Sequence, residues 1–99
     1  MKLTVNQVYG ILNNQHELDA LSNDAALKLF RIVVKLEDEF KAEFKAVEKA
    51  RKEQDQKELN KLAQIEKEVD VPSFTQDELK DQNLLTAKVL RIFRPIISV

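Results

Sequence analysis

Residues 35–62 read KLEDEFKAEFKAVEKARKEQDQKELNKL, and this stretch decides what kind of fold the chain adopts. It contains no Gly or Pro, and its apolar residues Leu36, Phe40, Phe44 and Val47 recur at spacings of three and four. Residues spaced in this way share one face of a helix. The stretch therefore predicts helix with a narrow apolar seam, either as one long rod or as two helices folded together.

A break in the seam favours two helices. The seam fades after Ala50, and the segment RKEQDQK that follows has no apolar side chain. Asp55 followed by Glu58 predicts a capping box, which is a signal for the start of a helix. An apolar face then resumes in a different helical phase, at Leu59, Leu62, Ile65 and Val69. We predict a break near Gln54 and an antiparallel hairpin, while one helix over about 24–68, roughly 65 Å long, stays the alternative.

Cap signals predict where the other helices begin. These signals are Thr4 with Gln7, Ser22 or Asn23, Thr75 with Glu78, and Thr86. The first helix should end between Asn13 and Glu17, a short one should cover about 76–81, and the last should stop at Pro95. Gly10 interrupts the apolar face of the first helix, which predicts either the close approach of another helix or fraying there.

An extended segment is predicted near 69–74, within the sequence EVDVPSF. The residue before a proline is pushed away from helical geometry, and apolar and polar side chains alternate here. The run from Ala26 to Leu36 is apolar on most of its circumference, so we place it at the centre of the fold, with the first and last helices packed on it. The expected core residues are Val8, Leu12, Leu29, Phe30, Val33, Leu36, Leu90 and Phe93.

These elements predict an all-α fold. The 99 residues suit a single domain, 1–99, formed as a small helical bundle with a central long antiparallel hairpin and one short extended segment. Apolar residues make up 43% of the chain, which is enough to support a core.

Composition excludes several classes of chemistry. The chain has no Cys, one His (His16) and one Gly (Gly10), so it offers no thiolate, no clustered zinc ligands and no phosphate-binding glycine loop. A net charge of −1 gives no general attraction to nucleic acid or anionic lipid. The N-terminal MKLTVNQVYG lacks a signal-peptide core, and no apolar run is long enough to span a membrane. We therefore expect no cofactor, no enzymatic activity and no membrane insertion.

Two apolar groups are the candidate partner interface. The C-terminal segment VLRIFRPIISV is apolar on more than one side, so it is either clamped inside the fold or exposed to a partner. Its candidate residues are Ile92, Phe93, Ile96, Ile97 and Val99. The seam residues Phe40, Phe44 and Val47 are likewise expected to be covered either by a helix of this chain or by another subunit.

A weak basic face is predicted on the last helix, where Lys88, Arg91 and Arg94 recur every three residues. Three cations in a row can contact phosphates, but such residues more often keep the outer face of a packed helix soluble. We do not expect nucleic-acid binding, and salt bridges to all three side chains would exclude it.

The order of these features resembles small, uncharacterised helical accessory proteins of tailed bacteriophages and prophages. A short capped helix (KLTVNQVYGIL) precedes a long Lys/Glu-rich helix, the segment KELNKLAQIEKEVDVPSF, a capped turn (TQDEL) and a closing apolar helix. The resemblance implies a phage virion or assembly accessory that acts by protein–protein contact. Its location would be the host cytoplasm or the virion, with a phage or host protein or further copies of itself as partner. The alternative is a phage-encoded inhibitor or modulator of a host or anti-phage defence protein.

Overall fold

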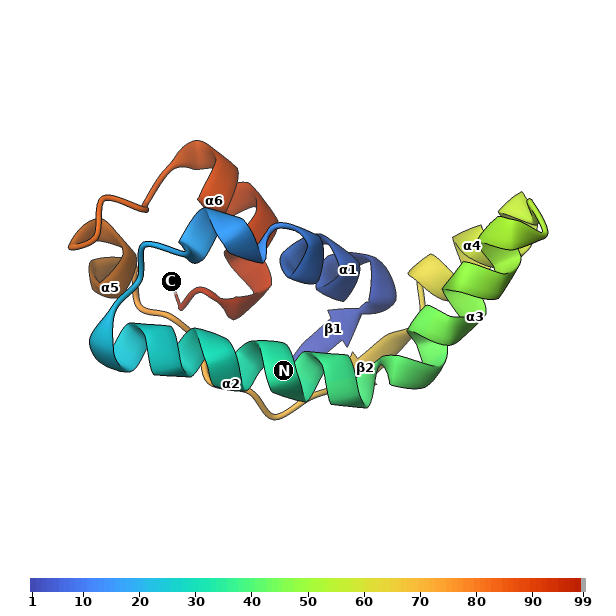
Figure 1. Ribbon diagram of the computed structural model, residues 1–99, viewed down its shortest axis with the longest axis horizontal. Helices are drawn as coiled ribbons and strands as arrows, with labels where there is room; N and C mark the ends of the chain where they lie inside the picture. Colours follow the sequence, from blue (N-terminus) through green and yellow to red (C-terminus); the bar gives the residue numbers. More distant parts are fainter. Residues whose placement is uncertain (99) are drawn as a thin grey trace.

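The computed structural model describes residues 1–98 and shows a mostly helical chain with one small sheet (Figure 1). In chain order the elements are β1 (Lys2–Thr4), α1 (Val5–Asn13), the 3-10 helix η1 (Gln15–Leu18), α2 (Asn23–Glu39), α3 (Lys41–Lys52), α4 (Gln56–Ala63), β2 (Glu66–Glu68), α5 (Gln76–Lys80), α6 (Ala87–Phe93) and the 3-10 helix η2 (Arg94–Ile96).

The N-terminal helix α1 begins at the predicted capping box. The backbone N–H of Gln7 donates to the Thr4 hydroxyl, and the N–H of Thr4 donates to the Gln7 side chain. The helix ends at Asn13, as expected. Both interpretations of Gly10 were wrong, because α1 continues through it and a Cβ built there meets nothing within 4 Å.

The predicted long helix is broken at Phe40 into α2 and α3. Phe40 has φ −109° and ψ 12°, and its side chain is fully buried. The Lys67 ammonium donates to the Glu39 carbonyl at 2.8 Å, so a side chain from β2 satisfies an acceptor at the end of α2. This bend was not predicted, because its cause is a contact between residues 28 positions apart.

The hairpin of α3 and α4 confirms the predicted break near Gln54. Gln54 has a left-handed backbone with φ 54°, and the N–H of Asp55 donates to the Ala50 carbonyl, as in a Schellman C-cap. The Asp55 carboxylate accepts from the N–H of Glu58 and starts α4. The hairpin is shorter than predicted and is not central, since it projects as an arm from one end of the molecule (Figure 1).

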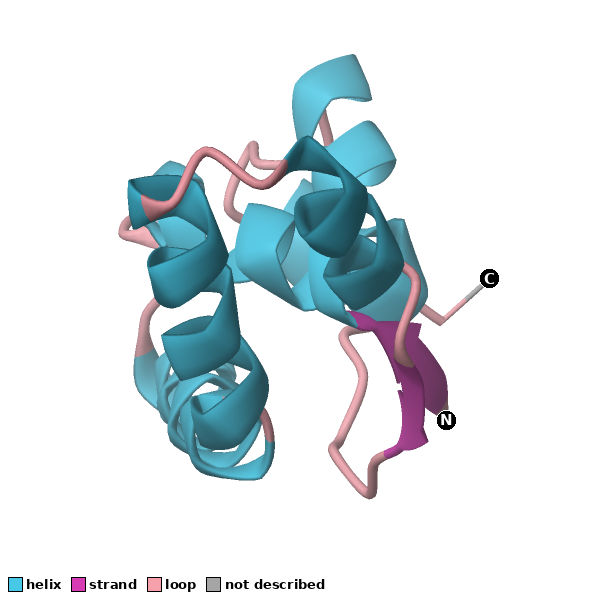
Figure 2. Ribbon diagram, turned by 90° about the vertical axis from the view of Figure 1, so that its right-hand side faces the viewer, coloured by secondary structure: helices cyan, strands magenta, loops and turns pink. Residues whose placement is uncertain are grey.

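The mostly helical fold confirms the coarser part of the prediction, while a two-stranded antiparallel sheet takes the chain outside the predicted all-α class (Figure 2). β1 pairs with β2 in the register Lys2↔Glu68, Leu3↔Lys67 and Thr4↔Glu66. The third predicted helix therefore stops at Ala63, well before Val69. β2 covers Glu66–Glu68, ahead of the predicted extended segment 69–74, and at the end of that segment Phe74 forms an isolated parallel bridge with Ile97.

The core lies on one side of α2, where α1, α6 and the C-terminal segment pack (Figure 1). Val8, Leu36 and Phe93 are fully buried as predicted, while Leu12, Leu29 and Val33 are half-buried. Phe30 and Leu90 were wrongly assigned to the core, since they are 65% and 40% exposed. The run from Ala26 to Leu36 is thus not at the centre of the fold, because α2 lies along an outer edge and only one of its faces is covered.

Candidate interaction surface

The C-terminal candidate interface is clamped inside the fold. Phe93 and Ile96 are fully buried, Ile97 is nearly so and Ile92 is half-buried. Val99 lies outside the described residues. The backbone of this segment pairs with Phe74, whose N–H donates to the Ile96 carbonyl at 2.7 Å. Phe93, Ile96 and Ile97 therefore serve the core, which agrees with the first of the two predicted alternatives for this segment.

Lys28 of α2 holds that clamp closed. Its ammonium donates to the Ser73 carbonyl at 3.1 Å and to the Glu78 carboxylate at 2.7 Å, and it lies over the Phe74 ring at 5.7 Å from the centroid. The Lys28 ammonium, followed by the N–H of Thr75, holds the pKa of Glu78 below its ordinary value. One cation thus ties α2 to the segment that covers the C terminus.

The second candidate group, along α3, is also largely covered. Phe40 is fully buried, Val47 is nearly so, and Phe44 is half-buried with its ring 5.9 Å from Tyr9 in an edge-to-face arrangement. Ile65, predicted on the apolar face of the third helix, lies beyond the end of α4 and is 37% exposed. The seam is covered from α1 and α4 within the chain, so it offers no continuous strip to another subunit.

A buried ion pair lies at the bend between α2 and α3. The carboxylate of Glu43, the one buried charged residue among residues 1–98, contacts the Lys67 ammonium. Its other oxygen, Oε2, has no hydrogen-bond partner among those residues. The same ammonium lies 5.4 Å from the centroid of the Phe40 ring. This cluster fastens β2 to the bend, which is a structural task.

The three cations of the predicted basic face differ in their contacts. Lys88 pairs with Glu17 at 2.7 Å, and this contact lowers the pKa of Glu17. Arg91 and Arg94 are exposed and have no carboxylate partner among residues 1–98. Two cations can make only a few contacts with phosphate groups. The His16 side chain is 64% exposed and lies beside Glu17.

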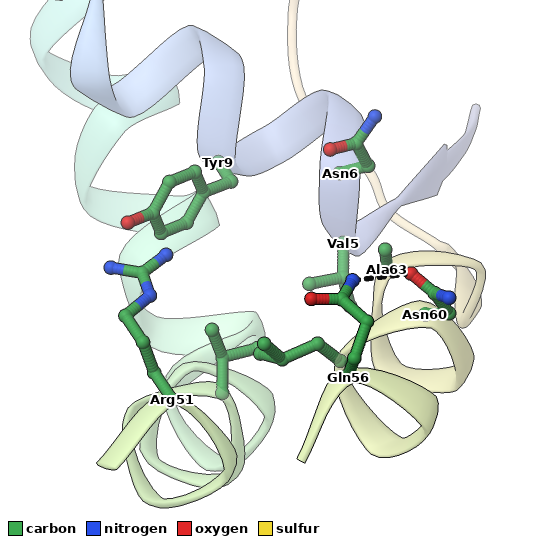
Figure 3. Close-up of a pocket in the computed structure, with 9 residues that line it drawn as sticks. Val5, Asn6, Tyr9, Arg51, Gln56, Asn60 and Ala63 are labelled. Atoms are coloured by element: carbon green, nitrogen blue, oxygen red, sulfur yellow. Dashed lines mark hydrogen bonds between the residues drawn. The ribbon is translucent and has the colours of Figure 1, made fainter. Parts of the chain in front are cut away.

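A cleft of about 260 Å³ opens between α1 and the α3–α4 hairpin (Figure 3). The Arg51 guanidinium lies beside Tyr9, 5.3 Å from the ring centroid, and the proximity of Arg51 and Asn13 lowers the pKa of Tyr9. Opposite them, the Gln56 amide donates to Asn60 at 3.0 Å. The lining residues include no carboxylate and no histidine. The arrangement can hold the hairpin against α1.

Three exposed apolar side chains form a row on the outer face of α2, which we call the α2 stripe. Leu27, Phe30 and Val34 are 55%, 65% and 49% exposed. Their spacings of three and four place them on one helical face. Ile32 and Leu36 on the opposite face are fully buried, so α2 fills its place in the core without the stripe.

The α2 stripe is bordered by a charged flank of exposed side chains. The flank consists of Asp24, Arg31, Lys35 and Asp38. Lys35 forms an exposed ion pair with Glu39, one helical turn on, at 3.1 Å. The N terminus of α2 beside this flank is incompletely capped, since Ser22 occupies the N-cap position without a side-chain hydrogen bond.

Sequence reasoning missed the α2 stripe, although it recognised the run that contains it. The signal was the width of the apolar circumference over 26–36, since a helix covered on one side requires a much narrower apolar face. That width was interpreted as complete burial. Complete burial is wrong for Leu27, Phe30 and Val34, which the structure leaves exposed.

Within residues 1–98, no helix combines the length and apolar character needed to cross a bilayer. The same residues contain no group of three metal-ligating side chains placed to hold a metal ion. No protein-family model, curated protein or solved structure matches the chain.

Proposed function

We propose that this chain is a non-enzymatic protein–protein interaction protein that contacts its partner through the α2 stripe. The observation that carries the proposal is the exposure of Leu27, Phe30 and Val34 in one row. Removing a large apolar side chain from water yields about 1.5–3 kcal/mol when burial is complete. Clustering such side chains on an outer helix face is typical of a binding surface, while single exposed apolar residues need no explanation.

The setting we propose is a tailed phage, with the chain acting as a virion or assembly accessory in the host cytoplasm or the particle. Support for this setting comes from the order of sequence features alone. A protein of this kind is expected to self-associate or to remain with purified particles. The alternative, an inhibitor or modulator of a host or anti-phage defence protein, uses the same surface but binds a single host protein.

The test is affinity capture from phage-infected host cells, with mass measurement of the intact complexes. Phe30→Glu places a charge in the middle of the α2 stripe and should abolish the capture seen with the wild-type chain. Leu90→Glu is the matched control, because Leu90 is also exposed but lies on α6, away from the stripe. Both variants should retain the wild-type far-UV circular dichroism spectrum.

The captured species distinguishes the two settings. Particle proteins or further copies of the chain would support the accessory role, and one host protein at a fixed ratio would support the inhibitor role. Recovery of the free monomer alone, from wild type and Phe30→Glu equally, would contradict the proposal.

A further inference from the structure

We infer that the partner seated on the α2 stripe is a second copy of this chain, paired antiparallel about a two-fold axis beside Phe30. This inference rests on the proposed function, because it names the partner of the same surface. A two-fold interface uses the same patch on both subunits, so the patch must be complementary to itself. The positions of the apolar and charged residues on α2 meet that condition.

The apolar residues are nearly symmetric about Phe30. Leu27 lies three residues before it and Val34 four residues after it, which is about 4.5 Å and 6 Å along the helix axis. Antiparallel pairing therefore places Phe30 against Phe30 and each Leu27 within about 1.5 Å, along the axis, of Val34 in the second copy. The whole α2 stripe is covered by this arrangement.

The charges on the flank complement one another in the same arrangement. Asp24 and Lys35 are eleven residues apart, close to three helical turns, so they lie on one flank of the stripe. In an antiparallel two-fold pair each flank meets the same flank of the other helix. Asp24 lies six residues before Phe30 and Lys35 five after it, so each Asp24 faces Lys35 of the second copy. Such pairs contribute to specificity and orientation.

Two pairings are repulsive. The two Arg31 side chains approach each other near the axis, and each Asp38 comes within about 3 Å, along the axis, of Asp24 in the second copy. All of these side chains are exposed, so salt and water screen the repulsion. The flank as a whole has two acidic and two basic residues, and the paired flanks are therefore neutral overall.

The helix ends favour antiparallel over parallel pairing. Asp38 lies eight residues after Phe30, and Ser22 lies eight before it. Antiparallel pairing thus brings the Asp38 carboxylate to the N terminus of the second α2, where Ser22 makes no side-chain cap bond. A carboxylate stabilises the positive end of a helix dipole, whereas a parallel pair would place it near the negative end.

The position of α2 leaves room for a second copy. The helix runs along an outer edge of the molecule, with α1 and α6 on its other side (Figure 1). An interface centred on three apolar side chains is small, so we expect association in the micromolar range or weaker.

The first experiment measures mass in solution by sedimentation equilibrium over a range of concentrations. The wild-type chain and Leu90→Glu should reach twice the monomer mass at high concentration. Phe30→Glu should remain a monomer, because two carboxylates would meet on the axis. A wild-type chain that stays monomeric up to millimolar concentration would overturn the inference.

The second experiment determines direction by cysteine cross-linking, which is straightforward because the chain has no Cys. Leu27→Cys mixed with Val34→Cys should give an oxidised heterodimer, since those positions face each other in the antiparallel pair. Leu27→Cys alone should not cross-link, because two copies of residue 27 would lie about 9 Å apart along the axes, beyond disulfide reach. Efficient cross-linking of Leu27→Cys alone would show parallel pairing and overturn the inference.

These results separate this inference from the proposed function. One outcome is a monomeric wild-type chain that still captures another protein, which Phe30→Glu does not capture. That result would overturn the second copy as partner and support the α2 stripe as the interaction surface. A dimer that Phe30→Glu leaves intact would overturn the inference, because self-association would then use another surface, and the capture experiment would test the α2 stripe separately.

Discussion

Two apolar segments of this chain, 27–34 (LKLFRIVV) and 89–97 (VLRIFRPII), have similar sequences and opposite environments. The first leaves Leu27, Phe30 and Val34 in solvent, while the second buries Phe93, Ile96 and Ile97. The C-terminal segment is short, bends at Pro95 and pairs with Phe74, so neighbours surround it. The straight helix α2 along an outer edge has neighbours on one side. A high content of apolar residues therefore predicts that a segment makes packing contacts. The position of the segment in the fold decides whether those contacts lie within the chain.

The largest expected effect comes from replacing one phenylalanine of each segment by alanine. Phe93→Ala should lower the free energy of unfolding by about 4 kcal/mol, because it leaves a cavity in the core. Phe30→Ala should change it by less than about 0.5 kcal/mol. Urea unfolding of the two variants measures the difference. Equal losses would show that the two segments are buried alike.

A smaller effect tests how the C-terminal segment is held. Lys28→Met should reduce stability by about 1–2 kcal/mol, because it removes a partly buried charged hydrogen bond to Glu78 and the bond to the Ser73 carbonyl. Lys35→Met is the control, since its ion pair with Glu39 is more exposed and should contribute about 0.5 kcal/mol or less.

The Lys28 contact also makes stability depend on pH. The folded-state pKa of Glu78 is lowered, so the contribution of this carboxylate is complete above its unfolded pKa, near 4.5, and is lost as the pH falls through the folded pKa. Urea unfolding as a function of pH should show a shallower acid loss in Lys28→Met than in the wild type. Parallel pH profiles would contradict the assignment.

A stabilising change is expected at Gly10. Gly10→Ala should raise the free energy of unfolding by about 0.5–1 kcal/mol, because α1 is regular there and the added methyl meets no atom within 4 Å. Thermal unfolding followed by circular dichroism measures the gain. A loss of stability would indicate that another helix packs closely against α1 at that point.

The smallest expected effect concerns the α2 stripe itself. Phe30→Gln should alter monomer stability by less than about 0.5 kcal/mol when measured at low protein concentration, because the side chain is mostly in water. The same change should weaken self-association measurably. A large loss of monomer stability would place Phe30 in the core, as the sequence first indicated.

Local signals in the sequence identified most helix boundaries correctly. Thr4, Asp55, Thr75 and Thr86 each accept a hydrogen bond from the backbone three residues on, as their positions predicted. Such caps depend on neighbouring residues alone, so a sequence pattern contains all that is needed. The turn near Gln54 was found for the same reason, even though no glycine marks it.

The candidate site was less predictable because burial is a property of the whole fold. Phe30 and Phe93 belong to equally apolar runs, and the first was assigned to the core while the second was placed both in the core and in a possible interface. The structure covers Phe93 and exposes Phe30. No local pattern distinguishes them, since the difference comes from elements that are remote in sequence.

The sequence by itself determined where helices start, that a turn falls near Gln54, and that α2 carries more apolar surface than one face requires. The tertiary structure alone decided the bend at Phe40, the pairing of β1 with β2 and the exposure of the α2 stripe. The physical reason is the distance along the sequence between the interacting residues. Caps and helical periodicity act within about one turn, whereas Lys67 reaching the Glu39 carbonyl and Phe74 pairing with Ile97 join distant parts of the chain.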